Sequence, residues 1–590
     1  MTSPPPPQHS PPPRRGFAAL RNRVRQSEGG LLLLAVVVGG VSALLTLAID
    51  RMSGALHVLL FGPGAAHGLS SIHDTSPWLL LAMPALGGLV LGGLNRLLAF
   101  YRSRALIDPI KANAVHGGRL PLDDGVVVAT QNLISNGFGA SVGLEAGYVQ
   151  IASSAASRLG QFFRLRRADL RVLLGCGAAG SLAAAFDAPL TGTFYAFELV
   201  VGVYSIATLF PVAVSAVTAT LVAGMLRNEA PLLTLAGTTT PDLQAHGLAV
   251  LLGLFCGLAG IALMRGVTLM EQGLRRSVPW PNLRPAVGGL GVGALALITP
   301  GVLFSGHGPL HQLFTMDTAL GAAATLLVLK ALASAISLGS GFRGSLFFAS
   351  LLLGALMGQI FAGILALVSP PGLDAVFLIT IGISAFAAAV IGGPLAMTFL
   401  AMEMTDNFSL TGAVMLAVVA SSITARRFFG YSFSTWRFHL RGGMIRSAHH
   451  IGWVRNLTVG KLMRRNPRTV KAETSLSAFR RDFPPGRVSE VIAVNEANRY
   501  AGIVSVADAN AESSDRLRTI APLLRHATTP LLPAMNAKEA MAIFEATESE
   551  ALAVIDNPGS YKVIGMLTEA ELVRHYNEEL ESRRTGDLGT

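Results

Sequence analysis

The chain has 590 residues, of which 51% are hydrophobic and 14% charged, and its formal net charge is +11. Because soluble globular chains average about 25% charged residues, this composition is that of a polytopic membrane protein. It excludes disorder over most of the chain, and two cysteines are too few for a disulfide-built secreted domain.

The positive charge is concentrated in two segments. Residues 1–28 carry a net charge of +4 and residues 425–472 carry +11, whereas residues 29–424 carry +2 and residues 473–590 carry −6. The positive-inside rule therefore predicts that both basic segments, and both chain termini, lie on the cytoplasmic side of the inner membrane. No helix-turn-helix, RNA-recognition or zinc-finger pattern accompanies the charge, so no nucleic acid partner is expected.

Apolar runs follow the basic tail, and the first, Gly30–Ile49, is long enough to cross a bilayer. Two glycine-rich interruptions, residues 136–143 and 337–344, fall at comparable positions in the halves 30–226 and 245–425. Non-helical backbone survives at membrane depth only where protein buries it or a cavity hydrates it, and paired breaks are typical of inverted-repeat transporters. We therefore predict an all-α membrane domain built as an inverted repeat with broken helices.

Pairs of glycines four residues apart recur in the apolar runs. They are Gly88/Gly92, Gly253/Gly257 and Gly354/Gly358. Such spacing allows two helices to cross closely. We interpret these pairs as packing sites within the bundle, with dimerisation as the alternative.

Beyond Asn456 the pattern changes to short strands and helices, and it contains a repeat. Residues 501–508 and 564–571 each hold a glycine, an apolar strand, a hydroxyl and an acid three residues later. The hydroxyl can cap a helix, and the same placement can hold a ribose and a phosphate. The predicted organisation is a disordered basic tail (1–28), a membrane domain (29–425), a basic linker (426–455) and a small α/β domain (456–583) in two halves (456–515 and 518–580).

Four motifs follow one another along the chain: residues 139–151, 184–192, 338–349 and 403–408. Together they resemble the CLC family of chloride channels and chloride/proton antiporters, with residues 139–151 as its glutamate-gate motif. The C-terminal repeat resembles a tandem pair of CBS domains. The resemblance implies a membrane homodimer, embedded in the lipid bilayer, with one anion pathway in each subunit.

The family's first filter loop reads Gly-Ser-Gly-Ile-Pro, whereas residues 105–109, which align with it, read Ala-Leu-Ile-Asp-Pro. Leu106 therefore replaces the serine that coordinates the anion. The gate motif ends Glu-Ala146-Gly rather than Glu-Gly-Pro, and the second-half loop ends Phe347-Phe-Ala349 rather than Phe-x-Pro.

Two further departures concern the pore and proton coupling. Ser434 aligns with the family's pore tyrosine, although Tyr431 lies three residues away. Leu199, which follows Glu198, aligns with the inner glutamate of the antiporters. The missing inner acid favours passive conduction over chloride/proton antiport.

Broken helices supply positive potential to an anion, because each helix start carries free N–H groups and about half a positive charge. The resemblance implies that the carboxylate of Glu145 occupies the anion's own site, and that protonation or displacement opens the pathway. The alternative is an ordinary helix-capping carboxylate. The residues expected along the pathway are Leu106, Asp108, Gly143, Leu144, Ala146, Arg343, Phe347, Phe348, Tyr431 and Ser434.

Five other charged residues allow two interpretations each. Asp108 and Arg343, one in each filter loop, either pair with each other or both turn outward to water. Glu198 either lines a water or proton route or is a hydrogen-bonded structural carboxylate. Glu403 is expected to hold a helix end rather than to carry ions. Lys330 either adds positive potential or extends to the membrane interface.

Three other function classes fit the sequence less well. Gly139-Ala-Ser-Val-Gly143 matches the Gly-x-Ser-x-Gly pattern of serine hydrolases. That chemistry needs a strand-turn-helix elbow and a histidine base within reach, but no predicted strand precedes Ser141. A CBS-regulated cation transporter would need more intramembrane acids as oxygen ligands. A membrane-anchored nucleotide sensor would need no broken helices.

The sequence therefore predicts an anion transport protein that is not an enzyme, moving chloride or another small anion, with protons as a further substrate in the antiporter alternative. No metal site and no required cofactor are predicted. The CBS resemblance implies that an adenine nucleotide (ATP or AMP) is the candidate ligand of Ser505, Asp508, Thr568 and Glu571. A purely structural or dimerising role is the alternative for this region.

Overall fold

The computed structural model describes residues 28–62, 65, 76–102, 104, 106–202, 204–227, 241–315, 319–368, 374–430, 432–433, 436, 458–465, 467–485, 488–511 and 517–575. Nearly all of them belong to one of two compact units, a larger one before and a smaller one after the segment 437–457. Residues 1–27 of the predicted tail and most of the predicted linker, together with Tyr431 and Ser434, lie outside the described residues.

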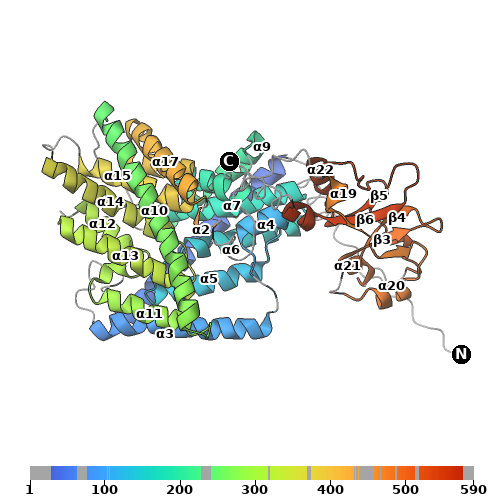
Figure 1. Ribbon diagram of the computed structural model, residues 1–590, viewed down its shortest axis with the longest axis horizontal. Helices are drawn as coiled ribbons and strands as arrows, with labels where there is room; N and C mark the ends of the chain where they lie inside the picture. The colour runs from blue at the N-terminus through green and yellow to red at the C-terminus, as the bar shows by residue number, and fades with distance from the viewer. Residues whose placement is uncertain are drawn as a thin grey trace, which may run out of the picture. The chain divides into compact units, whose positions relative to one another are not determined.

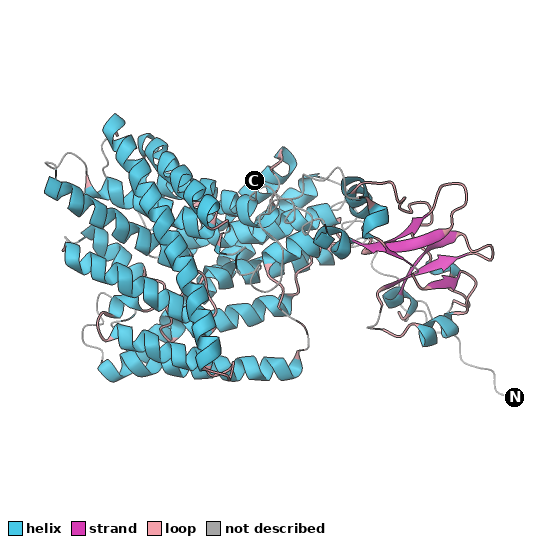
Figure 2. Ribbon diagram, viewed as in Figure 1, coloured by secondary structure: helices cyan, strands magenta, loops and turns pink. Residues whose placement is uncertain are grey.

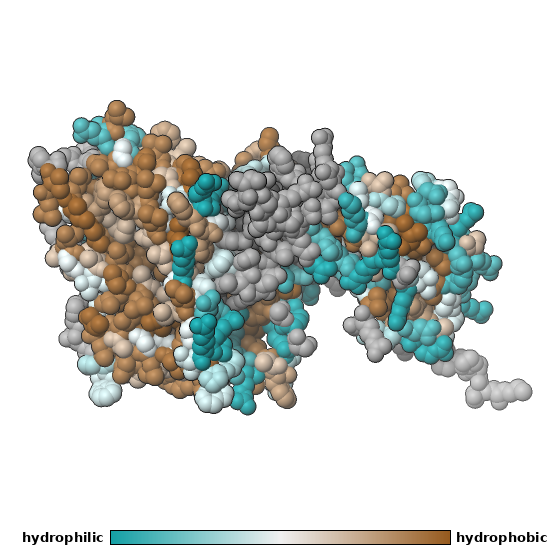
Figure 3. Space-filling view, viewed as in Figure 1, coloured by the Kyte–Doolittle hydropathy of each residue, from teal (hydrophilic) through white to brown (hydrophobic). Residues whose placement is uncertain are grey.

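Apart from one short backbone bridge, the regular secondary structure of the larger unit is helical over its described residues (Figure 1). Eight of its helices are long and apolar enough to cross a membrane, and the face seen in Figure 3 is mostly hydrophobic. The first half contains α2 (Glu28–Phe61), α3 (Pro77–Tyr101), α4 (Pro109–Val115), α5 (Leu122–Gly137), α6 (Glu145–Phe162), α7 (Arg167–Phe186), α8 (Pro189–Tyr195), the π-helix η3 (Ala196–Val201) and α9 (Ile206–Leu226).

The second half repeats this order of long and short helices. It contains α10 (Leu243–Ser277), α11 (Arg284–Ala296), the 3₁₀ turn η4 (Pro300–Val302), α12 (His307–Thr315), α13 (Leu320–Ser340), α14 (Phe347–Val368), α15 (Ala375–Ile391), α16 (Pro394–Thr405) and α17 (Phe408–Phe428).

Equivalent pairs of helices are in contact within the two halves. Helix α2 packs on α9 and α10 packs on α17, while α5 packs on α6 and α13 packs on α14. Between the halves, equivalent helices meet each other, because α3 packs on α11 and α8 packs on α16. This arrangement confirms the predicted repeat and brings the two broken segments, residues 138–144 and 341–346, to the middle of the unit.

The paired glycines lie where helix backbones touch. A methyl group on Gly92 would lie 1.9 Å from the carbonyl oxygen of Asn282, beside α11. One on Gly253 would lie 2.4 Å from a carbonyl oxygen of α17, and one on Gly354 would lie 2.2 Å from a carbonyl oxygen of α15. The prediction that these pairs serve packing within the bundle is therefore confirmed.

Substitution of Gly92 by alanine should destabilise the protein by about 1–3 kcal/mol, because the added methyl overpacks the α3–α11 crossing. Gly93 is the matched control, since a methyl group there meets no atom within 4 Å. Gly93→Ala should be neutral or stabilise by up to about 1 kcal/mol through helix propensity. Thermal unfolding in detergent measures both, and equal effects of the two substitutions would contradict the crossing.

The smaller unit contains the strands of the described structure (Figure 2). Its elements are α19 (Val459–Leu462), β1 (Arg464–Arg465), β2 (Thr469–Lys471), α20 (Leu476–Asp482), β3 (Glu490–Val494), β4 (Tyr500–Ser505), α21 (Val506–Ala509), η6 (Ala521–Leu523), α22 (Ala537–Thr547), β5 (Ala551–Ile555) and β6 (Val563–Thr568). The strands form two three-stranded sheets, ordered β2-β3-β4 and β1-β6-β5.

The repeat predicted from residues 501–508 and 564–571 is present in the two sheets. Strand β3 runs antiparallel to β4, and β5 runs antiparallel to β6. Glu490 lies opposite Ser505 in one sheet, and Ala551 lies opposite Thr568 in the other. Each hairpin also has a register shift at its fourth paired residue, so the two halves share one local design.

Candidate anion pathway

The two broken segments are bonded directly to each other. The amide of Gly143 donates to the carbonyl of Ser345 at 2.9 Å, and the amide of Ser345 donates to the carbonyl of Gly143 at 3.2 Å. This short antiparallel bridge joins the residues immediately before α6 to those immediately before α14. As a result, the starts of these two helices converge on one small region.

Polar side chains of α5 hold the bridge in place. The amide group of Asn132 donates to the carbonyls of Gly143 at 3.0 Å and Arg343 at 3.2 Å. Asn136 donates to the carbonyl of Val142 at 2.8 Å. These carbonyls are thereby turned toward α5, and Asn132 also accepts a hydrogen bond from the amide of Gly147, in the first turn of α6, at 2.7 Å.

Glu145 is the first residue of α6, and it is only 4% exposed. Its carboxylate accepts a hydrogen bond from the Ser345 hydroxyl at 2.7 Å. A methyl group on Gly143 would lie 2.0 Å from the carboxylate oxygen. The Glu145 carboxylate thus joins the two halves, and the glycine makes room for it.

The first filter loop is held by a buried acid that the sequence analysis did not single out. Asp124 of α5 is fully buried and accepts a hydrogen bond from the amide of Ile107 at 3.1 Å. It also forms ion pairs with Arg102 and Arg104. Leu106 therefore lies on an anchored loop and is half-buried, but it brings no hydroxyl to the site.

Asp108 and Arg343 each have a definite local contact. The Asp108 carboxylate caps α4 by accepting a hydrogen bond from the amide of Lys111 at 2.9 Å. The guanidinium of Arg343 donates to the side-chain oxygen of Gln131 at 3.1 Å. Both residues take part in further interactions, and their pairing stays a prediction.

The pairing hypothesis predicts that the changes in anion flux caused by Asp108→Asn and Arg343→Gln are not additive. The double variant should depart from the sum by more than about 0.5 kcal/mol, because removing one member of a pair already removes its interaction. Asp108→Asn combined with Arg275→Gln is the control, since Arg275 pairs with Glu271 elsewhere on α10. Simple additivity in both combinations would mean that the two side chains act independently.

Phe347 and Phe348 are buried at the start of α14, and their place beside the pathway stays a prediction. The Phe186 ring lies 4.8 Å from that of Phe347, and the Tyr195 ring lies 6.0 Å from it, edge-on. The His307 ring stacks on Phe348 with centroids 3.5 Å apart. Tyr195 and His307 escaped the sequence analysis because they lie in segments with no motif of their own, and Phe186 was not singled out within the motif 184–192.

Each of the two glutamates in the short helices binds the helix start of the opposite half. Glu198 lies in η3, which continues α8, and accepts hydrogen bonds from the amides of Leu395 and Ala396 at 3.0 Å each, at the start of α16. Glu403 of α16 accepts from the amides of Leu190 and Thr191 at 2.7 and 2.9 Å, at the start of α8. Glu403 thus holds a helix end, as predicted.

Comparisons with known proteins agree with this geometry. The profile "Voltage gated chloride channel" matches residues 87–426, more than half of the chain, and the profile "CBS domain" matches residues 459–513. The chain belongs to the voltage-gated chloride channel family. Its membership makes it a multi-pass membrane protein of anion transport and not an enzyme.

Three similar proteins illustrate this membership. The voltage-gated ClC-type chloride channel ClcB of Escherichia coli (strain SMS-3-5 / SECEC) is 29% identical over 398 residues, covering 66% of this chain and 94% of the relative. A eukaryotic CLC transporter shares the fold with a TM-score of 0.69 and 18% identity, over 94% of this chain and 98% of its own. A slow cyanobacterial Cl−/H+ antiporter has a TM-score of 0.61 and 20% identity, over 70% and 97%.

Within this chloride channel family member, Ser141 does not form a hydrolase elbow. It follows a helix, α5, rather than a strand. Its hydroxyl lies 3.0 Å from that of Ser334, and its amide donates to the Ser337 hydroxyl at 2.9 Å. Ser141 therefore joins the loop of the first half to helix α13 of the second.

Lys330 does not extend to the membrane interface, so that interpretation is wrong. Its side chain is fully buried, and its ammonium donates to the carbonyls of Val302, Leu303 and Phe304 at 3.1, 3.2 and 2.9 Å. These carbonyls close η4. The ammonium supplies the donors that this tight turn needs, because the turn has no helical hydrogen bonds for these groups.

A second buried polar contact was also missed. The Tyr148 hydroxyl, one turn beyond Glu145 on α6, donates to the Asp50 carboxylate of α2. The guanidinium of Arg227 lies 3.9 Å from the same carboxylate. Leu144 and Ala146 lie on either side of Glu145, the former buried and the latter half-buried, so they place the gate without polar groups of their own.

The CBS residues combine helix capping with ion pairing. Ser505 and Thr568 cap the helices that follow them, accepting from the amides of Asp508 at 3.3 Å and Glu571 at 3.1 Å, as predicted. The acids themselves are bonded to arginines, Asp508 to Arg525 at 2.7 Å and Glu571 to Arg464.

A buried carboxyl joins the two CBS halves. Glu490 of β3 accepts hydrogen bonds from the Ala551 amide of β5 at 2.8 Å and from the Ser549 hydroxyl at 3.3 Å. Burial raises the pKa of Glu490, while these hydrogen bonds act in the opposite direction. A hydrogen-bonded contact that the repeat pattern did not reveal therefore joins the two halves of the CBS unit.

Proposed function

We propose that this chloride channel family member moves chloride, or another small anion, passively through the inner membrane, and that Glu145 gates the pathway. The observation that carries the proposal is the position of the Glu145 carboxylate between the starts of α6 and α14, hydrogen-bonded to Ser345 across the bridge. A group of N–H and O–H donors at converging helix starts suits any small anion. The Glu145 carboxylate is the anion that the chain itself supplies to these donors.

Opening then requires the carboxylate to leave or to lose its charge. An ionised carboxylate holds the Ser345 hydroxyl at the bridge, and so closes the pathway. Protonation removes the charge that these donors stabilise, and the side chain can then turn away. The donors remain behind, aligned by Asn132 and Asn136 of α5, and the anion takes them over.

Passive conduction is supported by the residues next to Glu198. Leu199 is buried and apolar at the position where an antiporter would carry its inner acid, and the Glu198 carboxylate is occupied by two amides of α16. The alternative is chloride/proton antiport, the activity of the slow cyanobacterial antiporter that shares this fold.

Flux from purified protein in liposomes tests the proposal. Chloride, nitrate and fluoride gradients with a simultaneous proton readout should show anion movement without uphill proton movement. Proton transport against its gradient, driven by an anion gradient, would establish antiport instead. Absence of any anion flux would overturn the proposed function as a whole.

Glu145→Gln should increase anion flux at neutral pH and make it independent of pH. A hydrogen bond to a charged acceptor is worth about 1.5–3 kcal/mol, so loss of the charge should raise the open fraction by roughly tenfold to a hundredfold. Glu271→Gln is the matched control, because Glu271 lies in a partly exposed ion pair on α10. If Glu145→Gln kept the wild-type pH dependence, Glu145 would be a structural cap and not the gate.

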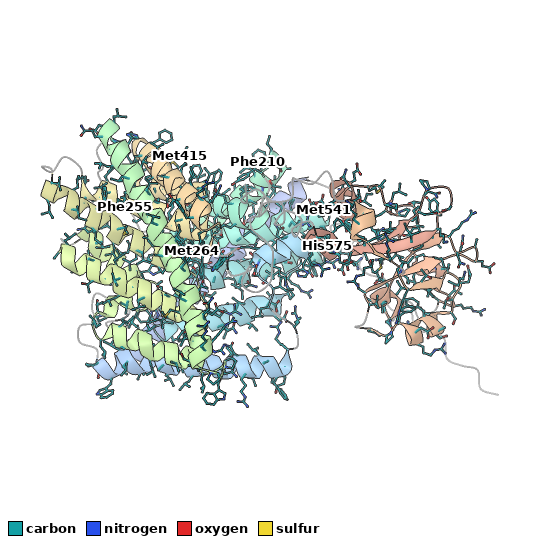
Figure 4. All side chains as sticks on the ribbon, in the orientation of Figure 1. Phe210, Phe255, Met264, Met415, Met541 and His575 are labelled. Atoms are coloured by element: carbon teal, nitrogen blue, oxygen red, sulfur yellow. The ribbon has the colours of Figure 1, made fainter. Side chains whose placement is uncertain are left out.

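We propose a homodimer with one pathway per subunit and both termini in the cytoplasm. The orientation is supported by the basic segments 1–28 and 425–472. Dimerisation is supported by apolar side chains that remain exposed on a helix of each half, such as Phe210 on α9, 58% exposed, and Met415 on α17, 48% exposed (Figure 4). Lipid also covers such side chains, so subunit counting in detergent and in liposomes is the test.

For the CBS unit we propose regulation by an adenine nucleotide such as ATP or AMP. Support comes from the family match and from a hydroxyl and an acid placed alike after β4 and β6. Because Arg525 and Arg464 hold the two acids, the ligand would have to free the acids for its ribose, and the released arginines would then face its phosphates.

The nucleotide should raise the thermal stability of the protein. A ligand at 100 times its Kd stabilises the folded state by about 2.7 kcal/mol. Thr568→Ala should weaken this effect, whereas Ser477→Ala, at an exposed position of α20, should not. A CBS unit that gains no stability from ATP or AMP would have the structural role instead.

A further inference from the structure

The anion needs donors that this sequence does not supply at the usual positions. Leu106 brings no hydroxyl to the first filter loop, and the bridge donors are held by Glu145 when the gate is closed. An anion that leaves water loses its hydration shell and must find replacement donors within the protein. The remaining hydroxyls near both filter loops therefore become candidates.

Tyr195 is the last residue of α8, at the point where the α-helix continues as the π-helix η3. Its ring meets that of Phe347, the first residue of α14, edge-on at 6.0 Å. Its hydroxyl interacts electrostatically with the carboxylates of Glu145 and Asp108. Tyr195 therefore lies among the starts of α4, α6 and α14, which is where the two filter loops and the gate come together.

The Tyr195 hydroxyl makes no hydrogen bond with any residue that the structure describes. Other tyrosine hydroxyls of this chain are engaged: Tyr148 donates to Asp50, and Tyr500 donates to the carbonyl of His526. Tyrosine hydroxyls inside proteins usually find such partners. A donor left over beside two filter loops is suited to a transient acceptor.

The repeat shows that the fold does not require this hydroxyl. Residues 189–198 (Pro-Leu-Thr-Gly-Thr-Phe-Tyr-Ala-Phe-Glu) correspond to residues 394–403 (Pro-Leu-Ala-Met-Thr-Phe-Leu-Ala-Met-Glu). The equivalent Phe194 and Phe399 stack on each other with centroids 4.4 Å apart. Leu400, the equivalent of Tyr195, is fully buried in the core, so a purely apolar side chain satisfies the packing at this position of the repeat.

We propose that the Tyr195 hydroxyl binds the transported anion next to the Glu145 site, donating its proton in place of the missing filter serine. The inference rests on the proposed anion transport and adds a binding residue to it. The Phe347 ring holds the tyrosine in position, and the carboxylate of Asp108 weakens the binding of the anion, so that it can leave. The hydroxyl is neutral, so it favours a dehydrated anion without trapping it.

The test compares Tyr195→Phe with the wild type, both in the Glu145→Gln background, so that the carboxylate does not compete for the anion. Isothermal titration with chloride should show binding about tenfold weaker in Tyr195→Phe, which is the effect expected from losing one hydrogen bond to a charged ligand. The concentration giving half-maximal flux in liposomes should rise by a similar factor. Tyr101→Phe, at a 75% exposed position at the end of α3, is the control.

Tyr195→Leu introduces the side chain that Leu400 has at the equivalent position, and it serves as the control for misfolding. It should unfold at the wild-type temperature and bind chloride as weakly as Tyr195→Phe. Unchanged chloride binding and unchanged half-maximal flux in folded Tyr195→Phe would overturn the inference while leaving anion transport intact. A Glu145→Gln parent that neither binds nor transports chloride would instead overturn the proposed function.

Discussion

The Gly143–Ser345 bridge is the contact on which the membrane unit's chemistry depends. Helix starts can supply positive potential only if they point at the same place, and the two starts here belong to segments 200 residues apart in the sequence. Two backbone hydrogen bonds align them, and the side chains of Asn132 and Asn136 hold the surrounding carbonyls away. Irregular backbone is tolerated at this depth because protein groups satisfy it.

Acids buried among the helices serve this architecture in two ways. Asp124, Glu198 and Glu403 each accept backbone N–H groups from a different segment and so join elements that are distant in the sequence. Glu145 instead accepts from a side-chain hydroxyl, that of Ser345, at the bridge where the two halves meet. Its position therefore distinguishes it from the structural acids more clearly than its burial does.

The sequence predicted what depends on local pattern. Glycines interrupting apolar runs marked both broken segments, and the spacing of Gly502, Ser505 and Asp508 against Gly565, Thr568 and Glu571 marked the CBS repeat. These features need only neighbouring residues to be recognised. The helix start at Glu145 follows from the same kind of signal, a carboxylate directly after a glycine-rich stretch.

Contacts between distant segments could not be predicted in this way. Glu198 and Glu403 each bind the start of the other's short helix. These contacts can be predicted only once the two short helices are known to lie side by side. Lys330 shows the same limit: on its own helix it suggests an interfacial side chain, and only the carbonyls of η4 reveal a buried partner. Tyr195 carries no motif at all, and only the comparison with Leu400 makes it conspicuous.

The Ser345 hydroxyl has one proton to donate, and it already accepts a hydrogen bond from the Phe347 amide at 2.9 Å. While the Glu145 carboxylate holds that proton, a permeating ion cannot, so the two are competing ligands of one donor. By mass action, a rise in the concentration of the permeant ion then shifts the equilibrium toward the displaced carboxylate. In the proposed mechanism the substrate would thus act as an opener of its own gate, and conductance would reach half its maximum at a higher concentration than the Kd of the unblocked site.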